Sequence, residues 1–126
     1  MAKKITLALL LLLMVGGSIL QNLYVDNATK ELNKDLEQVK TALENEDFAL
    51  AAAAADTFCA NWEEEKSKFE AFFEHKEVDS ISASAKSLQS YCHTESKEEA
   101  LAHVSAAIFY IDHIRDIDTL GWENVF

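Results

Sequence analysis

The sequence contains no proline, and its three glycines are Gly16, Gly17 and Gly121. Proline removes a backbone donor and glycine adds backbone freedom, so these two residues are the usual interruptions of a helix. Positions 18 to 120 contain neither of them. Strand patterns are missing as well, because no alternating run of Val, Ile or Thr lies between turn residues. The sequence therefore predicts an all-α protein.

Basic residues are scarce. The chain has 11 Lys and Arg against 22 Asp and Glu, a net charge of −11. All the acidic residues follow residue 25, where they meet nine basic ones, so this part of the chain carries a net charge of −13. Nucleic acids and anionic lipid surfaces both require Lys and Arg, and this balance excludes them as partners. It is typical of a solvated helical surface, and a basic partner is the alternative.

One long stretch lacks charge altogether. Residues 5–20 are uncharged and almost entirely apolar, directly after Lys3 and Lys4. A helix of this length covers about 24 Å, and extension to Val25 gives the 20 or so residues that span a bilayer. Since the basic pair stays on the cytoplasmic side, residues 1–25 are predicted to be a membrane anchor in contact with lipid over residues 5–25. Residues 26–126 are then predicted to lie outside the cytoplasm.

A cleavable signal peptide is the competing interpretation of the same stretch. A basic start, an apolar core and small residues where a peptidase cuts are all present, and cleavage would follow Gly17 or Ser18. However, Gly16-Gly17 differs from the Ala-x-Ala pattern, and apolar residues continue beyond it. No cysteine follows the apolar core, which argues against a lipoprotein. The anchor is therefore preferred, and a secreted module is the alternative.

Four apolar stripes with helical spacing follow the anchor. The first belongs to a helix that is expected to continue straight out of the membrane segment. Its members are Leu32, Leu36, Val39 and Leu43. The second helix is expected over residues 48–76, with Ala51, Ala52, Ala55, Phe58, Cys59, Trp62, Phe69, Phe72 and Phe73 on its buried face. The third stripe is Ile81, Ala85, Leu88, Tyr91 and Cys92, and the fourth is Leu101, Val104, Ile108, Ile111, Ile114 and Ile117.

Short polar turns are expected at residues 45–47, 77–79 and 93–95. Ser96, followed three residues later by Glu99, forms a capping box, so the fourth helix is predicted to begin there. Short turns join antiparallel neighbours, which predicts an antiparallel bundle of three to four helices after the transmembrane helix. A tail over residues 118–126 is expected to fold its apolar side chains, Leu120, Trp122 and Phe126, back onto the bundle.

The second half of the chain resembles an uncharacterised bacterial family of short membrane-anchored helical proteins, domain-of-unknown-function family 4363. The residues that carry the resemblance are Trp62, the run His75 to Ile81 including Asp79, Leu88, Tyr91, Ile114, and the ending Glu123-Asn124-Val125-Phe126. Lysines before an amino-terminal apolar helix belong to the same pattern. The alanine-rich stretch and Trp122 depart from it. The resemblance implies a membrane anchor, helical structure and a membrane protein as partner, with no activity or catalytic residue to carry over.

His75 and Asp79 flank the expected second turn. A metal or ligand contact is one interpretation of the pair. A structural role is preferred, because a histidine at the end of one helix and an aspartate capping the next complement the two helix dipoles. The family motif residues Trp62, His75, Asp79, Asn124 and Phe126 are accordingly interpreted as structural. The sequence suggests no catalytic or cofactor-binding residue.

The remaining histidines lack the spacing of a metal site. His103 and His113 share a helix face but lie about 15 Å apart, and no Glu-x-x-His tetrapeptide occurs. Glu99 and His103, one turn apart, are suited to binding a surface ion or simply to pairing with each other. Metal binding is therefore not expected.

Cys59 and Cys92 are the only cysteines, and export would place them where disulfides persist. Counted from the expected turn, their levels differ by about four residues, or about 6 Å. That distance is close to what a disulfide requires. A disulfide and two buried thiols are both consistent with the sequence, and catalysis by either cysteine is not expected because no base lies at a suitable spacing.

The aromatic residues near the end of the second helix, Phe72 and Phe73 among them, point in more than one direction. Packing against two neighbours is the preferred explanation, and an exposed phenylalanine in a partner surface is the alternative. The first stripe likewise suits either the core or a coiled-coil seam in a homo-oligomer.

The leading hypothesis is a non-enzymatic, single-pass protein of the cell membrane with a cytoplasmic amino terminus. Its exported helical bundle would bind another membrane or envelope protein. The alternatives are a secreted binding module released by cleavage and, with little support, an enzyme or metal carrier.

Overall fold

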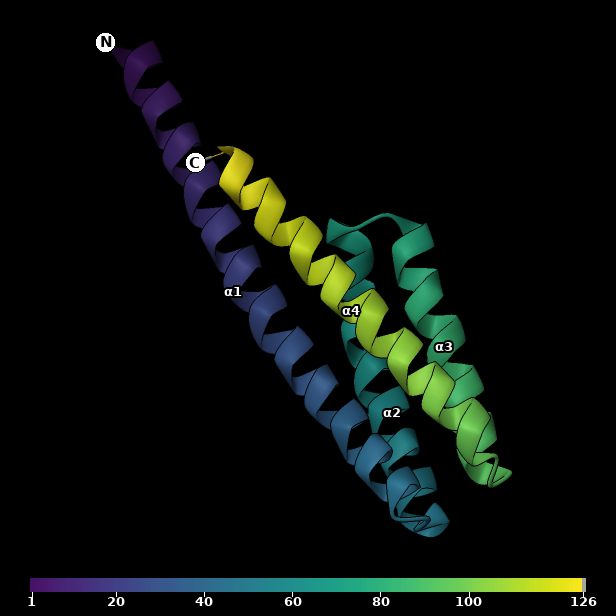
Figure 1. Ribbon diagram of the computed structural model, residues 1–126. Coiled ribbons are helices and arrows are strands. Elements are labelled where there is room, and N and C mark those ends of the chain that lie inside the picture. The colour runs from purple at the N-terminus through teal and green to yellow at the C-terminus, as the bar shows by residue number, and fades with distance from the viewer. Residues whose placement is uncertain (126) are drawn as a thin grey trace.

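The computed structural model describes the backbone of residues 1–125 and the side chains of residues 1–119. Four helices account for nearly all of it: α1 (Ala2–Glu44), α2 (Phe48–Phe72), α3 (His75–His93) and α4 (Lys97–Val125) (Figure 1). No strand occurs within residues 1–125. The all-α prediction is confirmed.

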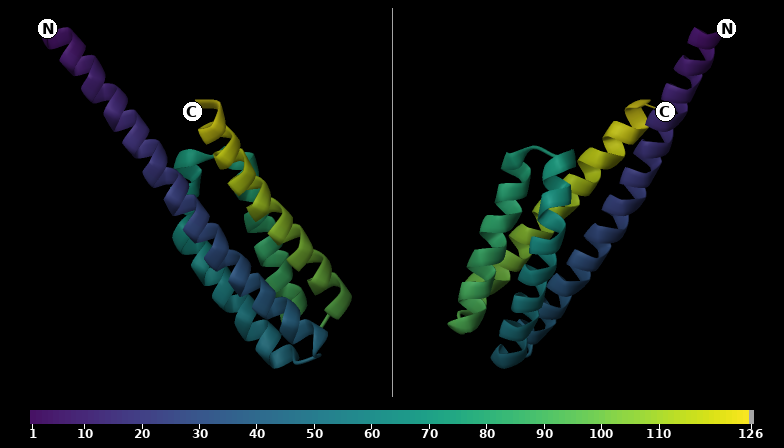
Figure 2. Two further views of the ribbon diagram at one scale, coloured as in Figure 1. Left: turned by 60° about the vertical axis from the view of Figure 1, so that its left-hand side comes forward. Right: turned by 180° about the vertical axis from the view of Figure 1, so that it is seen from behind.

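The helices form an antiparallel four-helix bundle. Each packs against two others, in the pairs α1–α2, α2–α3, α3–α4 and α4–α1. Successive helices run up and down, and α4 returns alongside α1 (Figure 2). Short connections make consecutive helices antiparallel neighbours. The sequence predicted a bundle of three to four helices. The structure has four, and the first of them is the carboxyl-terminal half of α1.

The core consists mainly of the predicted stripes, although Phe72 and Ile117, which the sequence placed on buried faces, are exposed. Its largest fully buried side chains are Trp62, Phe58, Phe69, Leu32, Leu36, Leu43, Ile81, Leu88, Ile111 and Ile114. Small residues, Ala51 and Ala55 on α2 and Ala100 and Ala107 on α4, are completely buried too. Alanine combines high helix propensity with a short side chain, so it allows neighbouring helices to approach closely.

α1 has two different halves. Its side chains from Met1 to Met14 are exposed, whereas from Val25 onward one side chain per turn is buried in the bundle. The helix passes from one half to the other without interruption. Because the stripe from Leu32 to Leu43 is buried within the same chain, this face does not form a coiled-coil seam with a second copy.

The first turn lies where the sequence placed it. α1 ends at Glu44, and Glu46 adopts a positive φ of 56°. Asp47 then caps α2, since its side-chain oxygen accepts a hydrogen bond from the backbone N–H of Leu50 at 3.2 Å. Such a cap satisfies one of the free N–H groups at a helix start.

The second turn lies earlier than predicted. α2 ends at Phe72 and α3 begins at His75, so the link is Phe73 and Glu74 rather than residues 77–79. Phe73 has an extended backbone (φ −127°, ψ 162°), and its ring contacts the edge of Phe69, with the centroids 5.8 Å apart. Leaving the helix there allows the Phe73 ring to turn back onto the core. The expected helix end at residue 76 and the expected cap at Asp79 were wrong.

The start of α4 agrees with the sequence, and its end does not. The helix begins at Lys97, directly after Ser96, whose hydroxyl lies 3.1 Å from that of Thr94. It then continues through Val125 instead of ending in a separate tail. A single glycine within a helix costs only about 1 kcal/mol, so Gly121 does not end it. The predicted packing of Leu120, Trp122 and Phe126 lies outside the described side chains.

Candidate functional site

Trp62 joins α2 to α3. Its side chain is 1% exposed, and the indole Nε1–H donates a hydrogen bond to the hydroxyl of Ser82 at 2.9 Å. The indole also meets Phe69 edge-on, with the ring centroids 5.5 Å apart. Trp62 is thus a core residue whose one polar group has a partner.

His75 and Asp79 do not form the site that the sequence suggested. Both are exposed and lie one turn apart within α3. His75 is the first residue of that helix, at its positive end, rather than the last residue of the preceding one. The expected stabilisation of His75 by a negative helix pole is therefore wrong. Asn124 lies within α4, and its side chain, like Phe126, is outside the described part of the chain.

Cys59 and Cys92 are free thiols in the structure. The Cys59 thiol donates a hydrogen bond to the carbonyl oxygen of Ala85 at 3.3 Å, which sets Cys59 level with Ala85. Cys92 lies seven residues further along α3, or about 10 Å at the rise of a helix. A disulfide requires Cα atoms about 4.4–6.8 Å apart. The register of α2 against α3 therefore favours two free thiols over a disulfide.

Burial also makes both thiols unreactive. It raises the pKa of Cys59 to about 11, and the nearby charge of Asp56 adds to the effect. Burial raises the pKa of Cys92 to about 11 in the same way. Because only the thiolate is nucleophilic, neither sulfur is activated for catalysis near neutral pH.

The other histidines make separate contacts. The ring of His103 stacks on Tyr91, with centroids 5.4 Å apart. His113 Nε2 lies 3.7 Å from a carboxylate oxygen of Glu77. Within the described residues, no group of three or more His, Cys, Asp or Glu side chains converges as a metal site would require.

A polar cluster on the surface links α2 to α3, and no sequence pattern predicted it. Gln89 Nε2 donates to Asp56 Oδ1 at 2.8 Å, and His93 Nε2 lies 2.8 Å from the same oxygen. The hydrogen bonds from Gln89 and His93 lower the pKa of Asp56 below its ordinary value. The spacing of four residues between Gln89 and His93 places them on one face, but their partner depends on the register of two helices.

A second polar contact lies where the apolar half of α1 ends. The amides of Gln21 and Asn22 donate to the two carboxylate oxygens of Asp118, at 3.0 and 2.9 Å. Figure 2 shows the final turns of α4 beside this part of α1. Nearby, the ring of Tyr24 meets Phe72 edge-on, and Phe72 is 43% exposed. The preferred interpretation, in which these rings all pack in the core, is therefore wrong for Phe72, and the alternative of an exposed phenylalanine is found here.

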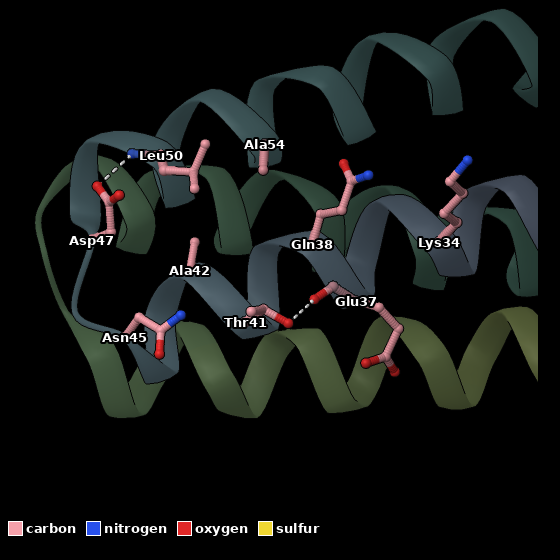
Figure 3. Close-up of a pocket in the computed structure, with 9 residues that line it drawn as sticks. All are labelled: Lys34, Glu37, Gln38, Thr41, Ala42, Asn45, Asp47, Leu50 and Ala54. Carbon is pink, nitrogen blue, oxygen red and sulfur yellow. Dashed lines mark hydrogen bonds between the residues drawn. The ribbon is translucent and has the colours of Figure 1, made fainter.

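A shallow groove lies between α1 and α2 near the first turn (Figure 3). Its apolar side chains are Ala42, Leu50 and Ala54. The charged side chains at its rim do not converge, since Lys34 and Glu37 point away from each other (Figure 3). Specific small-molecule sites combine an enclosed pocket with converging polar groups, and this groove lacks both.

Comparison with known families gives one result. Residues 19–125 match the family DUF4363, described as a domain of unknown function. The chain belongs to this family. No curated protein and no solved structure matched the chain.

The extent of the DUF4363 match coincides with the bundle. It begins two residues before Gln21, which bonds to α4, and ends at Val125, the last residue of that helix. Most of the exposed apolar segment, residues 1–18, lies outside it. The family resemblance drawn from the sequence is confirmed, and DUF4363 in this chain is a four-helix bundle.

Proposed function

We propose that this DUF4363 protein is a single-pass membrane protein with a cytoplasmic amino terminus. Its bundle, outside the cytoplasm, binds another membrane or envelope protein and catalyses no reaction. The observation that supports this proposal is the composition of α1. One uninterrupted helix combines an exposed apolar half with a half that is built into the bundle.

The apolar half needs a surrounding other than water. Among the described residues, α1 is the only helix long and apolar enough to cross a membrane, and its most apolar stretch is not buried in the bundle. Leu7, Leu9 to Leu13 and Met14 are each more than half exposed. Soluble proteins rarely expose contiguous apolar patches beyond a few hundred Å². A bilayer covers this surface, and the positive-inside rule orients Lys3 and Lys4 toward the cytoplasm.

The chemistry of the bundle supports binding rather than catalysis. Its thiols have pKa values near 11. Its histidines make separate contacts: His103 with Tyr91, His93 with Asp56, and His113 with Glu77 and Phe109. A catalytic site needs a nucleophile or base with an orienting partner in a cleft, and the described residues do not bring these together.

A secreted module is the second candidate. The family match leaves out residues 1–18. Among the side chains of residues 1–119, cleavage after Gly17 or Ser18 would remove no hydrogen bond that joins two helices. The released bundle would keep the contacts of Gln21 and Asn22 with Asp118. The proposed role in binding would then be carried out in solution.

Fractionation combined with intact mass separates the two candidates. An anchored chain keeps its full mass and floats with membranes, and a cleaved chain is shorter by about 17 residues and soluble. Orientation is tested in the Cys59→Ser, Cys92→Ser background, with one new cysteine at Glu46 or at Ala2. A membrane-impermeant maleimide added to intact cells should label Glu46→Cys and leave Ala2→Cys unlabelled. The opposite pattern would reverse the proposed topology.

Partner binding needs its own test in native membranes. A photo-crosslinking amino acid is placed at single exposed positions on each of α2, α3 and α4. We expect the same membrane or envelope protein to be captured from one face and not from the others. Equal capture from every face, or none from any, would refute the proposal that the bundle binds another membrane or envelope protein, even for a correctly anchored chain.

A further inference from the structure

The middle of α4 lacks charge in an otherwise highly charged chain. Asp, Glu, Lys and Arg make up 26% of the sequence, yet residues 100–111 contain none of them. One side of this segment is explained by the core, where Ala100, Val104, Ala107 and Ile111 are completely buried. The bundle does not explain why the opposite side is uncharged as well.

That opposite side exposes an aromatic ring among small residues. Ala102, Ser105 and Phe109 are exposed, and Ala106 is half-buried beside them. Phe109 is 65% exposed, more than any other large apolar side chain between residues 21 and 119. Helices that are apolar on all sides are normally buried on all sides. We call the surface formed by these four residues the α4 face.

Phe109 is held in a defined position. Its ring lies parallel to that of His113, with the planes 3° apart and the centroids separated by 6.2 Å. It also meets Tyr110 edge-on at 5.8 Å. A preordered aromatic side chain loses little conformational entropy on binding, and such residues often dominate interface energies.

The spacing of the α4 face suits a second helix. Glu98, Ala102, Ser105, Phe109, Asp112 and Asp116 follow one another at intervals of four and three residues, the pattern of a helix-packing seam. The seam is about 27 Å long. Its centre is apolar, and acidic residues lie at both ends.

The charge at the ends identifies the kind of partner. Glu98 and Glu99 lie at one end. Asp116 lies at the other end and is exposed, next to Asp112, which accepts a hydrogen bond from Asn33 of α1 at 2.9 Å. A second copy of this acidic chain in parallel orientation, as a shared membrane requires, would place like charges opposite each other. A helix with an apolar stripe between Lys or Arg residues would instead pair with both ends.

We infer that the α4 face is the docking site for a cationic amphipathic helix of a partner membrane protein. This inference rests on the proposed function and specifies its surface and its ligand. Because α4 runs beside α1 toward the anchor (Figure 1), a partner helix that leaves the same membrane would lie along it. A single helix over this length buries less than about 1,200 Å², so the contact is of the weak, reversible class.

Binding of a defined probe tests the inference. The full chain in detergent micelles is titrated with an amphipathic peptide about 18 residues long, with Leu and Ala on one side and Lys along the flanks. A matched peptide carries Glu in place of Lys. We expect the Lys peptide to bind and the Glu peptide not to bind. The effect of Phe109→Ala should be a loss of about tenfold or more in affinity, the size expected for an aromatic anchor.

Matched variants separate this face from the rest of the surface. Leu50→Ala, which shortens a side chain that is 55% exposed on α2, should leave the affinity unchanged. The double variant Glu98→Gln, Asp116→Asn should bind the Lys peptide more weakly and with less dependence on salt. The matched double variant on α1, Glu31→Gln with Glu37→Gln, should change neither property. Unchanged helicity by circular dichroism confirms that each variant is folded.

Three outcomes would overturn the inference. One is Lys-peptide binding that Phe109→Ala does not alter, and another is equal binding of the Glu peptide. The third is a dimer of this chain that dissociates on Phe109→Ala, which would make a second copy the occupant. The proposed function fails separately, if the chain is not anchored or captures no protein from any face.

Discussion

Removal of the Ser82 hydroxyl should destabilise the bundle, although Ser82 lies on a helix where alanine is the better residue. Trp62 is 1% exposed, and its indole N–H donates to Ser82 Oγ. Ser82→Ala leaves this buried donor without a partner, at a cost of about 1–3 kcal/mol. Alanine returns about 0.5 kcal/mol in helix propensity. The expected net loss is about 1–2 kcal/mol, or a decrease in Tm of about 5–15 °C for a domain of this size.

The effect of Ser82→Ala on stability should no longer be a loss once the indole is removed. In the Trp62→Phe background no donor is left unpaired, so Ser82→Ala should be neutral or stabilising by up to about 0.5 kcal/mol. Ser90→Ala, at an exposed position of the same helix, is the matched control and should also be neutral or stabilising. Unfolding of the full chain in micelles is followed by circular dichroism. Equal effects of Ser82→Ala in both backgrounds would refute the assignment of this hydrogen bond.

Three further predictions concern thiols, pH and the end of α4. Without reductant, Cys59 and Cys92 should remain unalkylated by iodoacetamide in the folded chain and take up two adducts after unfolding; adducts that require prior reduction would establish a disulfide. Asp56 has a lowered pKa, so its ionised form stabilises the fold above about pH 4 and this contribution disappears as the pH falls through the folded-state pKa. Asp56→Asn should therefore remove up to about 1 kcal/mol at pH 7 and progressively less as the pH falls below about 4, measured by denaturant unfolding over that range. Asp118→Ala should accelerate amide hydrogen exchange in the last turns of α4 and leave exchange in α3 unchanged.

The sequence was sufficient for features that depend on one helix at a time. The stripe from Leu32 to Leu43 identified a buried face, and Ser96 marked the start of the fourth helix, because periodicity and capping are local properties. The second turn was misplaced although a local indication existed. Val78 lies three residues before Ile81 and continues the stripe of α3, and it is completely buried.

Contacts between helices required the register, which the sequence does not contain. Counted from the observed turn, Cys59 lies 13 residues before Phe72 and Cys92 lies 17 residues after His75, so their levels still differ by about four residues. The hydrogen bond from Cys59 to Ala85 indicates a larger offset, which is set by the packing of α2 against α3 and not by the position of the turn. The bonds from Gln21 and Asn22 to Asp118 join residues nearly a hundred positions apart. Only the assembled bundle brings them together. Phe109 was not predicted for another reason: an apolar stripe defines the face of a helix that packs in the core and carries no information about the opposite face.

The continuity of α1 connects the proposed anchor to the proposed docking surface. A flexible linker would let the bundle rotate freely above a membrane. A helix that runs unbroken from Ala2 to Glu44 instead fixes the orientation of the bundle relative to the apolar half of α1. Asp118 then holds α4 against α1 at the level where the apolar half ends. The direction of the α4 face relative to the anchor is therefore set by covalent structure and by this contact together. A partner helix that leaves the membrane beside α1 would meet a surface already oriented toward it, which reduces the orientational cost of binding.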